Sequence, residues 1–212
     1  GIDLEGAGVA IQGFGNVGSH AAGFLAERGA RVVAVSDVHG GLLREEGLDV
    51  ETLASRHAEE PERPLAELGV DGEPLSNEEL LALDVDVLVP AAIEAVLRGD
   101  NVGDVRARLV VEAANLPTTC EAHSVLVDRG IPVVPDILAN AGGVTVSYLE
   151  WVQNRERMRW SAERVNDRLE HVLRRAWDGV RERAGGEGID YRQAAYELAV
   201  ERVREAIELR GF

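Results

Sequence analysis

The sequence predicts a doubly wound α/β fold, in which helices cover both faces of a parallel sheet and a helical C-terminal extension follows. Up to residue 136, short apolar runs rich in β-branched residues alternate with segments of helical periodicity. This alternation is typical of a parallel sheet with crossover helices. Beyond residue 136 only helical periodicity remains. We therefore expect an α/β domain over residues 1–150 and packed helices over residues 151–212.

A strand, a helix and a second strand make up the first unit of this fold. Val9–Ile11 is a short apolar run of the kind found in buried strands. Apolar positions recur at helical spacing through residues 17–28 and stop at Gly29, a residue that favours helix ends. Arg31–Ser36 supplies a β-branched second strand. Together these segments have the length of about 30 residues that a β-α-β unit needs.

The later elements continue the alternation. Residues 39–75 are rich in Gly, Pro and Glu, and one helix is expected there, near 49–58. Ser76–Glu79 has the sequence of a capping box, which opens a helix. The elements expected after it are a strand at Val85–Val89, a helix near 101–107, a strand at Leu109–Glu112, a helix near 118–129 and a strand at Ile131–Val134.

Two apolar stripes at helical spacing dominate the C-terminal part. The first runs through residues 161–184 and is expected to end at Gly185-Gly186, and the second runs through residues 194–207. Stripes of this kind are packing faces. They could also dock onto a domain that this chain does not contain.

The charge of the chain narrows its partners. Its 38 acidic residues outnumber its 22 basic ones, which are all arginine, and the net charge is −16. Such a charge argues against nucleic acid or an anionic membrane as partner, and no apolar run approaches the ~18 residues of a membrane span. The lack of lysine excludes a Schiff-base lysine and a P-loop lysine. Either a salt-rich cytoplasm or a GC-rich genome explains this composition.

The single cysteine and the first residues of the sequence bear on the cellular compartment of the protein. Cys120 is the sole cysteine, so no internal disulfide can form, and we expect it to be a small buried side chain. The sequence opens at Gly1 without a secretory signal, and we expect a cytoplasmic protein of which this chain is an excised or processed piece. No metal site is expected.

A glycine turn joins the first strand to the first helix and predicts a Rossmann-like dinucleotide site. Gly13 permits the tight turn, Gly15 lets a pyrophosphate approach the backbone, and Gly18 lets the helix pack on the strand. The free N–H groups at the start of the helix then face the phosphates. A purely structural glycine turn is the alternative.

Asp37, at the end of the second strand, predicts the choice of cofactor. It lies 19 positions after Gly18, where a carboxylate can accept from ribose hydroxyls. A 2′-phosphate would be repelled there, so NAD is favoured, with NADP as the alternative. Asp37 could instead form a turn ahead of Gly40-Gly41.

Several separated motifs agree in order and spacing with one known family. They are Gln12–Gly18 with Ser36-Asp37 and Gly40-Gly41, Pro90–Ala92, Glu112–Asn115 with Pro117–Thr119, and Val134–Tyr148 continuing to Glu150-Trp151. Together they resemble the cofactor domain of the glutamate dehydrogenases, and the resemblance runs through nearly the whole chain.

The resemblance implies roles for particular residues. Those expected at the cofactor are Gly13, Phe14, Gly15, Asn16, Val17, Gly18, Asp37, Ala91, Ala92 and Asn115, with the last three beside the nicotinamide. Those expected at the substrate are Asn140, Gly143, Val144 and Ser147, where Ser147 resembles the serine that binds the side-chain carboxylate. From the residues alone, Asn140 could cap a helix, Gly142-Gly143 could be packing glycines, and Ser147 could be a buried helix serine.

Four positions depart from the resembled pattern, all in two segments of the chain. Leu116 and Ala113 stand where the family usually has Gly, Cys120 where it often has Pro, and Ala95 where Asn is common.

The function implied is oxidative deamination of L-glutamate to 2-oxoglutarate and ammonia by an NAD(P)-dependent dehydrogenase. The resemblance places the catalytic lysines and aspartate in a preceding domain, which also builds a homo-oligomer, expected to be a hexamer. No catalytic residue is therefore expected in this chain, and the chain is expected to be inactive alone. The alternatives are a dehydrogenase of apolar amino acids and a non-catalytic NAD(H)-sensing domain.

Overall fold

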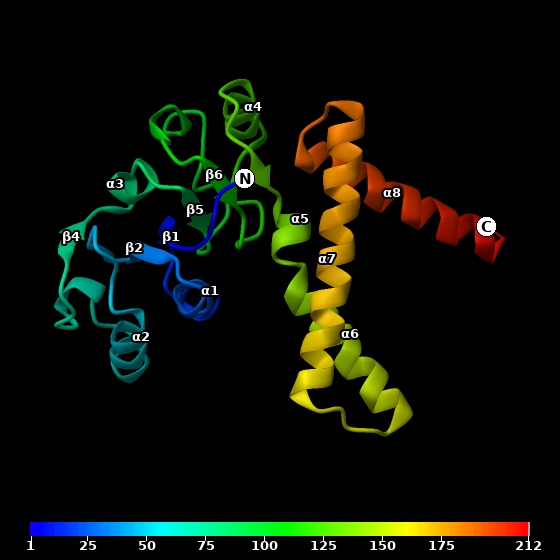
Figure 1. The fold of residues 1–212 in the computed structure, drawn as a ribbon, viewed down its shortest axis with the longest axis horizontal. Coiled ribbons are helices and arrows are strands. Elements are labelled where there is room, and N and C mark those ends of the chain that lie inside the picture. The colour runs from blue at the N-terminus through cyan, green and yellow to red at the C-terminus, as the bar shows by residue number, and fades with distance from the viewer. Residues whose placement is uncertain (212) are drawn as a thin grey trace. The chain divides into compact units, whose positions relative to one another are not determined.

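The computed structural model describes residues 1–211, which form two compact units (Figure 1). The first unit is Gly1–Val133 and the second begins at Val134. The boundary expected after residue 150 lies within an uninterrupted helix, α6 (Ala141–Glu156).

A seven-stranded sheet in the order β4-β3-β2-β1-β5-β6-β7 organises the first unit. The central strand β1 (Gly8–Gln12) is parallel to β2 (Arg31–Asp37) on one side and to β5 (Val87–Pro90) on the other. β6 (Leu109–Val111) is parallel to β5, and β7 (Val133–Val134) lies at the edge. The chain thus winds outward from β1 in both directions, and the predicted doubly wound α/β fold is confirmed.

Two strands at the other edge were not predicted, and they make the sheet mixed rather than wholly parallel. β3 (Gly40–Leu43) pairs antiparallel with β2, and β4 (Glu73–Leu75) pairs antiparallel with β3. The pairing of Asp37 with Gly40 makes a tight hairpin, for which Gly40 adopts a φ of +128°. A Cβ on Gly41 would stand 2.5 Å from the Val35 carbonyl oxygen, so the glycines allow a close approach.

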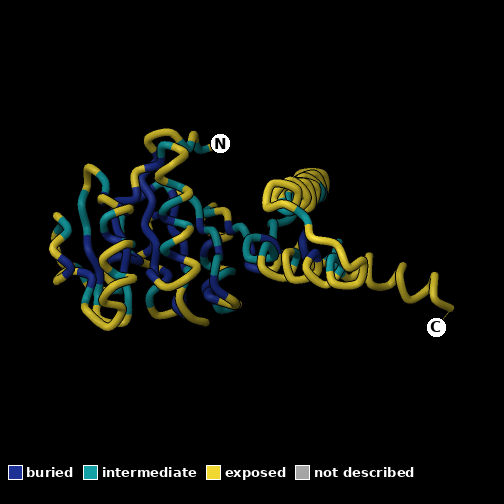
Figure 2. The backbone as a smooth tube through the Cα atoms, turned by 90° about the horizontal axis from the view of Figure 1, so that it is seen from below, coloured by how far each residue is buried: buried dark blue, intermediate teal, exposed yellow. Residues whose placement is uncertain are grey.

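Helices cover both faces of the sheet. Alternate residues of β1 point to opposite faces, so each contacts a different set of helices. Val9 and Ile11 pack with residues of α1 (Asn16–Glu27) and α2 (Val50–Glu59), whereas Ala10 packs with residues of α3 (Asn77–Leu81) and α4 (Cys120–Asp128). Figure 2 shows the strands as the buried centre of this unit.

Some of the sequence predictions for the helices of the first unit are confirmed and others are wrong. The capping box at Ser76 and Glu79 is confirmed. The helix expected near 101–107 is only a 3-10 turn, η2 (Val102–Asp104), one of two such turns with η1 (Leu65–Glu67). Cys120 was expected to be buried, which is wrong: it is exposed at the first position of α4.

The second unit is helical throughout, as predicted. It consists of α5 (Asp136–Ala139), α6, α7 (Ala162–Glu187) and α8 (Tyr191–Arg210). The end expected for α7 at Gly185-Gly186 is wrong, because the helix continues to Glu187 and stops at Gly188, which has a φ of +70°. Glycine inside a helix costs only about 1 kcal/mol, and the left-handed cap supplies the actual stop.

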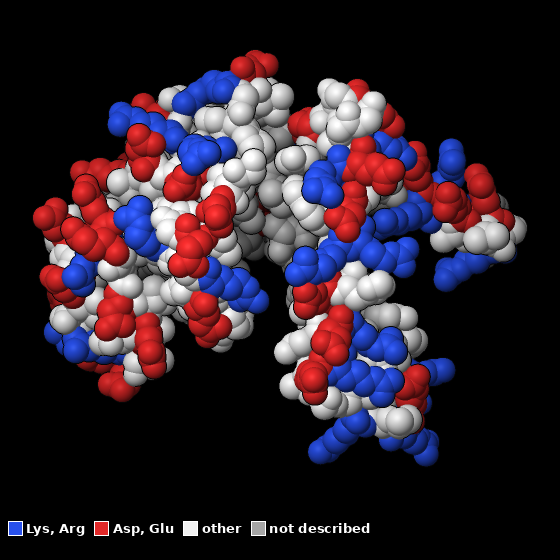
Figure 3. Space-filling view, viewed as in Figure 1, with Lys and Arg blue, Asp and Glu red and all other residues white. Residues whose placement is uncertain are grey.

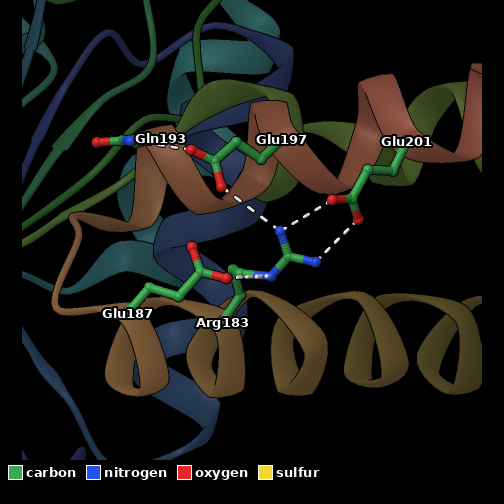
Figure 4. A network of polar contacts seen from close by, with 5 residues as sticks. All are labelled: Arg183, Glu187, Gln193, Glu197 and Glu201. Atoms are coloured by element: carbon green, nitrogen blue, oxygen red, sulfur yellow. Dashed lines mark hydrogen bonds and ion pairs between the residues drawn. The ribbon is translucent and has the colours of Figure 1, made fainter.

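Arg183 ties α7 to α8 (Figure 4). Its guanidinium lies 2.8 Å from Glu201 and 3.5 Å from Glu197 on α8, and 3.2 Å from Glu187 on its own helix. The hydrogen bond between Arg183 and Glu201 is the main cause that raises the pKa of the arginine and lowers the pKa of the glutamate. A second pair, Arg192 with Asp136 at 3.5 Å, ties the start of α8 to the start of α5.

The rest of α8 exposes an apolar stripe. Tyr196, Val200, Val203 and Ile207 recur at spacings of four and three residues and are each exposed by more than two fifths. Figure 2 shows the C-terminal half of α8 exposed all round. None of the helices in residues 1–211 combines the length and the apolar character that a membrane crossing requires.

Candidate functional site

The carboxyl ends of four parallel strands meet along one rim of the sheet. This carboxyl edge runs across the strands and is distinct from the outermost strands β4 and β7. β1 leads there into the glycine turn, β2 ends at Asp37, β5 leads into Ala91-Ala92, and β6 leads into the segment with Asn115. β1 and β5 are neighbours whose connections leave in opposite directions, and ligands of doubly wound sheets bind at such a switch point. The structure therefore brings all ten residues expected at the cofactor to one edge.

The three glycines of the turn differ in what surrounds them. Gly13 has a φ of +99°, and a Cβ there would stand 2.7 Å from the Ala92 Cβ. A Cβ on Gly18 would overlap the carbonyl oxygen of Gly13. By contrast, Gly15 is exposed, and no atom lies within 4 Å of the position its Cβ would take. Packing within the protein explains Gly13 and Gly18, but it does not explain Gly15.

The N-terminus of α1 opens beside Gly15. Gly15 is the N-cap and provides no side-chain cap, and the first turn holds no acidic residue. The backbone N–H groups of the first helical turn have no partner within a helix, and the positive end of the helix dipole adds to their attraction for anions. Asn16 and Val17 are exposed at this end. The turn thus has the features of a phosphate site.

Phe14 contributes to the core rather than to the surface of the turn. Its side chain is 1% exposed, and its ring centroid lies 5.7 Å from that of His57 on α2. Only the backbone of Phe14 is therefore in a position to contact a ligand at the turn.

Asp37 takes part in the turn ahead of Gly40-Gly41, as the structural alternative predicted. Its carboxylate can still accept further hydrogen bonds. The His39 N–H donates to Asp37 Oδ1 at 2.7 Å, within the hairpin that joins β2 to β3. Asp37 is partly exposed at the carboxyl end of β2. Since a carboxylate has about four acceptor positions, the turn bond leaves acceptors for ribose hydroxyls.

The segments that follow β5 and β6 are joined to each other. The Ala91 N–H donates to the Gln12 carbonyl at 2.7 Å, and the N–H groups of Ala113 and Ala114 donate to the Pro90 carbonyl at 2.9 Å. The first bond holds Ala91-Ala92 against the end of β1. The other two fix the start of the segment with the exposed Asn115 beside the end of β5.

At this edge Asn77 was not predicted as a site residue, and Gln12 was predicted only as part of the Gln12–Gly18 motif. Asn77 bonds to both Ser36 and Asp37. The Oε1 of Gln12, directly before Gly13, is buried without a hydrogen-bond partner among the described residues. Asn77 has no sequence signal of its own, because its contacts join positions about 40 residues apart.

The residues expected at the substrate share one face of α6 in the second unit. Gly143, Val144 and Ser147 are exposed, and Asn140 begins the helix at the spacing that places all four on one side. The opposite face is the packed one, where Leu149 is 5% exposed.

Of the residues with a packing alternative, Gly142 has a neighbour at contact distance, because a Cβ there would stand 4.0 Å from Leu169 Cδ1. The Asn140 side chain makes no capping bond to α6, and no atom lies within 4 Å of a Cβ built on Gly143. Ser147 is exposed rather than buried, whereas Thr145 bonds its own helix at the Ala141 carbonyl, 2.8 Å away. Gly143, Val144 and Ser147 are therefore available to something other than the second unit itself.

A mainly apolar groove of about 750 Å³ adjoins this face. It lies between α6 and α7 and is lined by Val144, Thr145, Tyr148, Leu149, Asp167, Arg168, His171 and Val172. Within residues 1–211, no group of three or more His, Cys, Asp or Glu side chains is arranged to hold a metal ion.

Comparison with known proteins identifies relatives along the whole chain. The family profile described as glutamate/leucine/phenylalanine/valine dehydrogenase matches residues 1–211. The cryptic catabolic NAD-specific glutamate dehydrogenase GudB of Bacillus subtilis is 47% identical over 212 residues, which are 100% of this chain and 49% of the relative. The NAD-specific glutamate dehydrogenase A of Halobacterium salinarum is 50% identical over 203 residues, with 96% and 46% covered.

Solved structures give the same result. The hetero-hexameric glutamate dehydrogenase of Thermus thermophilus, in its Leu-bound form, superimposes with a TM-score of 0.90 and 42% identity and covers 100% of this chain. The glutamate dehydrogenase of Peptoniphilus asaccharolyticus superimposes with a TM-score of 0.82 and 35% identity, over 99% of the chain. This chain covers 49% of the former and 48% of the latter, so it spans about half the length of the relatives it matches.

Proposed function

The chain belongs to the glutamate/leucine/phenylalanine/valine dehydrogenase family, and we propose that it is the cofactor-binding part of an NAD-dependent glutamate dehydrogenase. The complete enzyme would convert L-glutamate to 2-oxoglutarate and ammonia. Several relatives are named as NAD-specific glutamate dehydrogenases. Since this chain spans about half their length, the activity is proposed for the complete enzyme.

The open space above Gly15 carries the proposal. A Cβ at this position would have no atom of the protein within 4 Å, and Gly15 is the N-cap of α1, so the open space lies at the N-terminus of that helix. A pyrophosphate that lies against the backbone requires this space. The residues present therefore fit a dinucleotide, with the phosphates on the N–H groups of the first turn of α1.

The remaining residues at this edge have distinct roles in the proposal. The Asp37 carboxylate accepts from the ribose hydroxyls, and it disfavours NADP because a 2′-phosphate would bring negative charge to it. The backbone at Ala91-Ala92 and the side chain of Asn115 orient the nicotinamide. NAD, when bound, supplies a hydride acceptor, and the protein supplies position and electrostatics.

Glutamate is proposed as substrate because of the exposed face on α6. Asn140, Gly143, Val144 and Ser147 are its contact residues, with the Ser147 hydroxyl donating to the side-chain carboxylate. In a dehydrogenase of apolar amino acids, this hydroxyl would lie against an apolar side chain without a partner, which costs free energy. The exposed hydroxyl of Ser147 thus favours an acidic substrate over an apolar one.

The part of the enzyme outside this chain is proposed to supply the catalytic lysines and aspartate and to build a homo-hexamer. The apolar stripe of α8 is proposed to pack against that part. Tyr196, Val200, Val203 and Ile207 expose more apolar surface on one helix face than a solvated helix needs. The helices of residues 151–212 would thus pack both against this chain and against the rest of the enzyme.

Titration of NADH and NADPH against the chain tests the proposal. We expect NADH to bind at least about tenfold more tightly, which is the effect of about 1.4 kcal/mol of repulsion at Asp37. Asp37→Ser should narrow the difference. Asp84→Ser is the matched control, because Asp84 is an exposed aspartate just before β5, at the opposite edge of the sheet. Equal or tighter binding of NADPH by the unaltered chain would overturn the choice of NAD.

A further inference from the structure

We infer that Asn77 is a positioning residue for the cofactor's ribose, because it holds the backbone of Asp37 in place and so strengthens the preference for NAD over NADP. This inference rests on the proposed function, in which Asp37 accepts from the ribose hydroxyls.

Both ends of the Asn77 amide are engaged with the end of β2. Nδ2 donates to the Asp37 carbonyl at 2.9 Å, and Oδ1 accepts from the Ser36 hydroxyl at 2.7 Å. Ser36 is fully buried. The pair of bonds joins residues 40 and 41 positions apart in the sequence. Because donor and acceptor each have a partner, the amide can adopt only one orientation without losing a bond.

Asn77 itself stands on a rigid base. It is the first residue of α3, directly after the N-cap Ser76. The Ser76 hydroxyl accepts from the Glu79 N–H at 3.1 Å, and the Ser76 N–H donates to the Glu79 carboxylate at 2.7 Å. Leu80, one turn further on, is fully buried in the core beneath the sheet. The capped start of α3 thus fixes the Asn77 backbone relative to β2.

Asp37 needs an external support because the chain reverses immediately after it. Asp37 pairs with Gly40 across a hairpin whose tip, Val38, is 91% exposed. Apart from the ladder, the turn bond from His39 to the Asp37 carboxylate holds this tip. A shift of the Asp37 backbone would move its carboxylate by a similar distance, and displacements of about 1 Å impair a binding group. Asn77 opposes such a shift from the side of α3.

The test compares the affinities for NADH and NADPH in variants of the full chain. Asn77→Ala should weaken NADH binding about fivefold, in line with the loss of one or two hydrogen bonds, and should leave NADPH binding within about twofold. Ser36→Ala, a milder change, should act in the same direction with a smaller factor. Asn101→Ala is the matched control: Asn101 also has both amide ends engaged, at 2.8 Å to Arg98 and 2.8 Å to Val96, but it contacts neither Ser36 nor Asp37.

A double variant separates positioning from general stability. In an Asp37→Ser chain, Asn77→Ala should have no further effect on the ratio of the affinities for NADH and NADPH. In the otherwise unaltered chain, Asn77→Ala and Asn101→Ala should lower the melting temperature by similar amounts. Equal weakening of NADH and NADPH, or effects of Asn77 and Asp37 that multiply independently, would overturn the inference while leaving the proposed function standing. A preference for NADH that does not depend on Asp37 would overturn both the inference and the role proposed for Asp37.

Discussion

The Ala95 N–H donates to the Leu116 carbonyl at 2.9 Å, and both residues adopt the left-handed conformation, with φ of +50° and +46°. These are two of only three non-glycine residues with positive φ in residues 1–211. They are also two of the positions that depart from the family pattern, in which Asn and Gly are the common residues. The contact continues in a parallel bridge between Leu97 and Thr118. The segments after β5 and β6 are therefore joined beside Asn115 at the cost of local strain.

Leu116→Gly should stabilise the chain. The left-handed conformation costs a residue with a side chain about 1–2 kcal/mol, and Leu116 gains little from burial because it is 56% exposed. Relief of about 1 kcal/mol corresponds to a rise of roughly 2–4 °C in melting temperature for a chain of this size. Val38→Gly is the control, because Val38 is exposed in a turn without a positive φ, and it should give no rise. Equal effects of the two changes would show that strain at Leu116 is not the cause.

Two glycines of the turn should separate binding from stability. Gly15→Ala meets open space at an ordinary φ of −76°, so the melting temperature should change by no more than about 2 °C. The added methyl group should nevertheless weaken NADH binding at least about tenfold, because it occupies the space of the pyrophosphate. Gly18→Ala overlaps the Gly13 carbonyl and should cost about 2 kcal/mol of stability. If Gly15→Ala binds NADH normally, the phosphates lie elsewhere.

Ser147 should set the side-chain specificity of the complete enzyme. Ser147→Val removes the hydroxyl proposed to donate to the substrate carboxylate, and Ser147 is exposed, so the fold should be unaffected. We expect kcat/KM for glutamate to fall at least about tenfold more than kcat/KM for norvaline. Thr145→Val, on the packed face two residues away, should not change that ratio. An equal loss for both substrates would give Ser147 a structural role only.

Molar KCl should raise the melting temperature of the chain. Residues 1–133 contain 24 acidic residues against 9 arginines, and Figure 3 shows acidic side chains over much of this unit's visible surface. Carboxylates crowded in this way repel one another, and salt screens the repulsion, with a Debye length of about 3 Å at 1 M. Thermal melts from low to molar KCl measure the effect. A flat or falling melting temperature would leave genome composition as the explanation for the missing lysines.

The sequence predicted those parts of the fold whose signals are local. β1, α1 and β2 were foreseen because β-branched runs, helical spacing and a glycine turn follow one another within 37 residues. β3 and β4 were not, since a four-residue strand with two glycines and a three-residue strand with a proline gain their stability from pairing. The end of α7 was misplaced because two adjacent glycines look like a stop, although the helix continues through them and ends only at the left-handed cap of Gly188.

The candidate site was predictable to a similar extent. The glycine turn and Asp37 have characteristic spacing, so their place at the carboxyl edge followed from the fold. The double role of Asp37 was foreseen only as two alternatives, because the bond from His39 depends on the hairpin to β3. Asn77 could not be foreseen, since its contacts with β2 exist only once α3 is folded against the sheet.

Nucleotide binding and turnover measured on one preparation of this chain separate cofactor binding from catalysis. NADH fluorescence is titrated to saturation, and NADH production from glutamate and NAD is then assayed in the steady state. We predict saturable binding without turnover. Gly15, Asp37 and Asn115 lie within the chain, whereas the resembled mechanism needs a lysine and this sequence contains none. Without the groups that orient and stabilise the reacting atoms, the rate falls by many powers of ten. Glutamate turnover by this lysine-free chain, or a folded chain that does not bind NADH, would show that the chain is not the cofactor-binding part of such an enzyme.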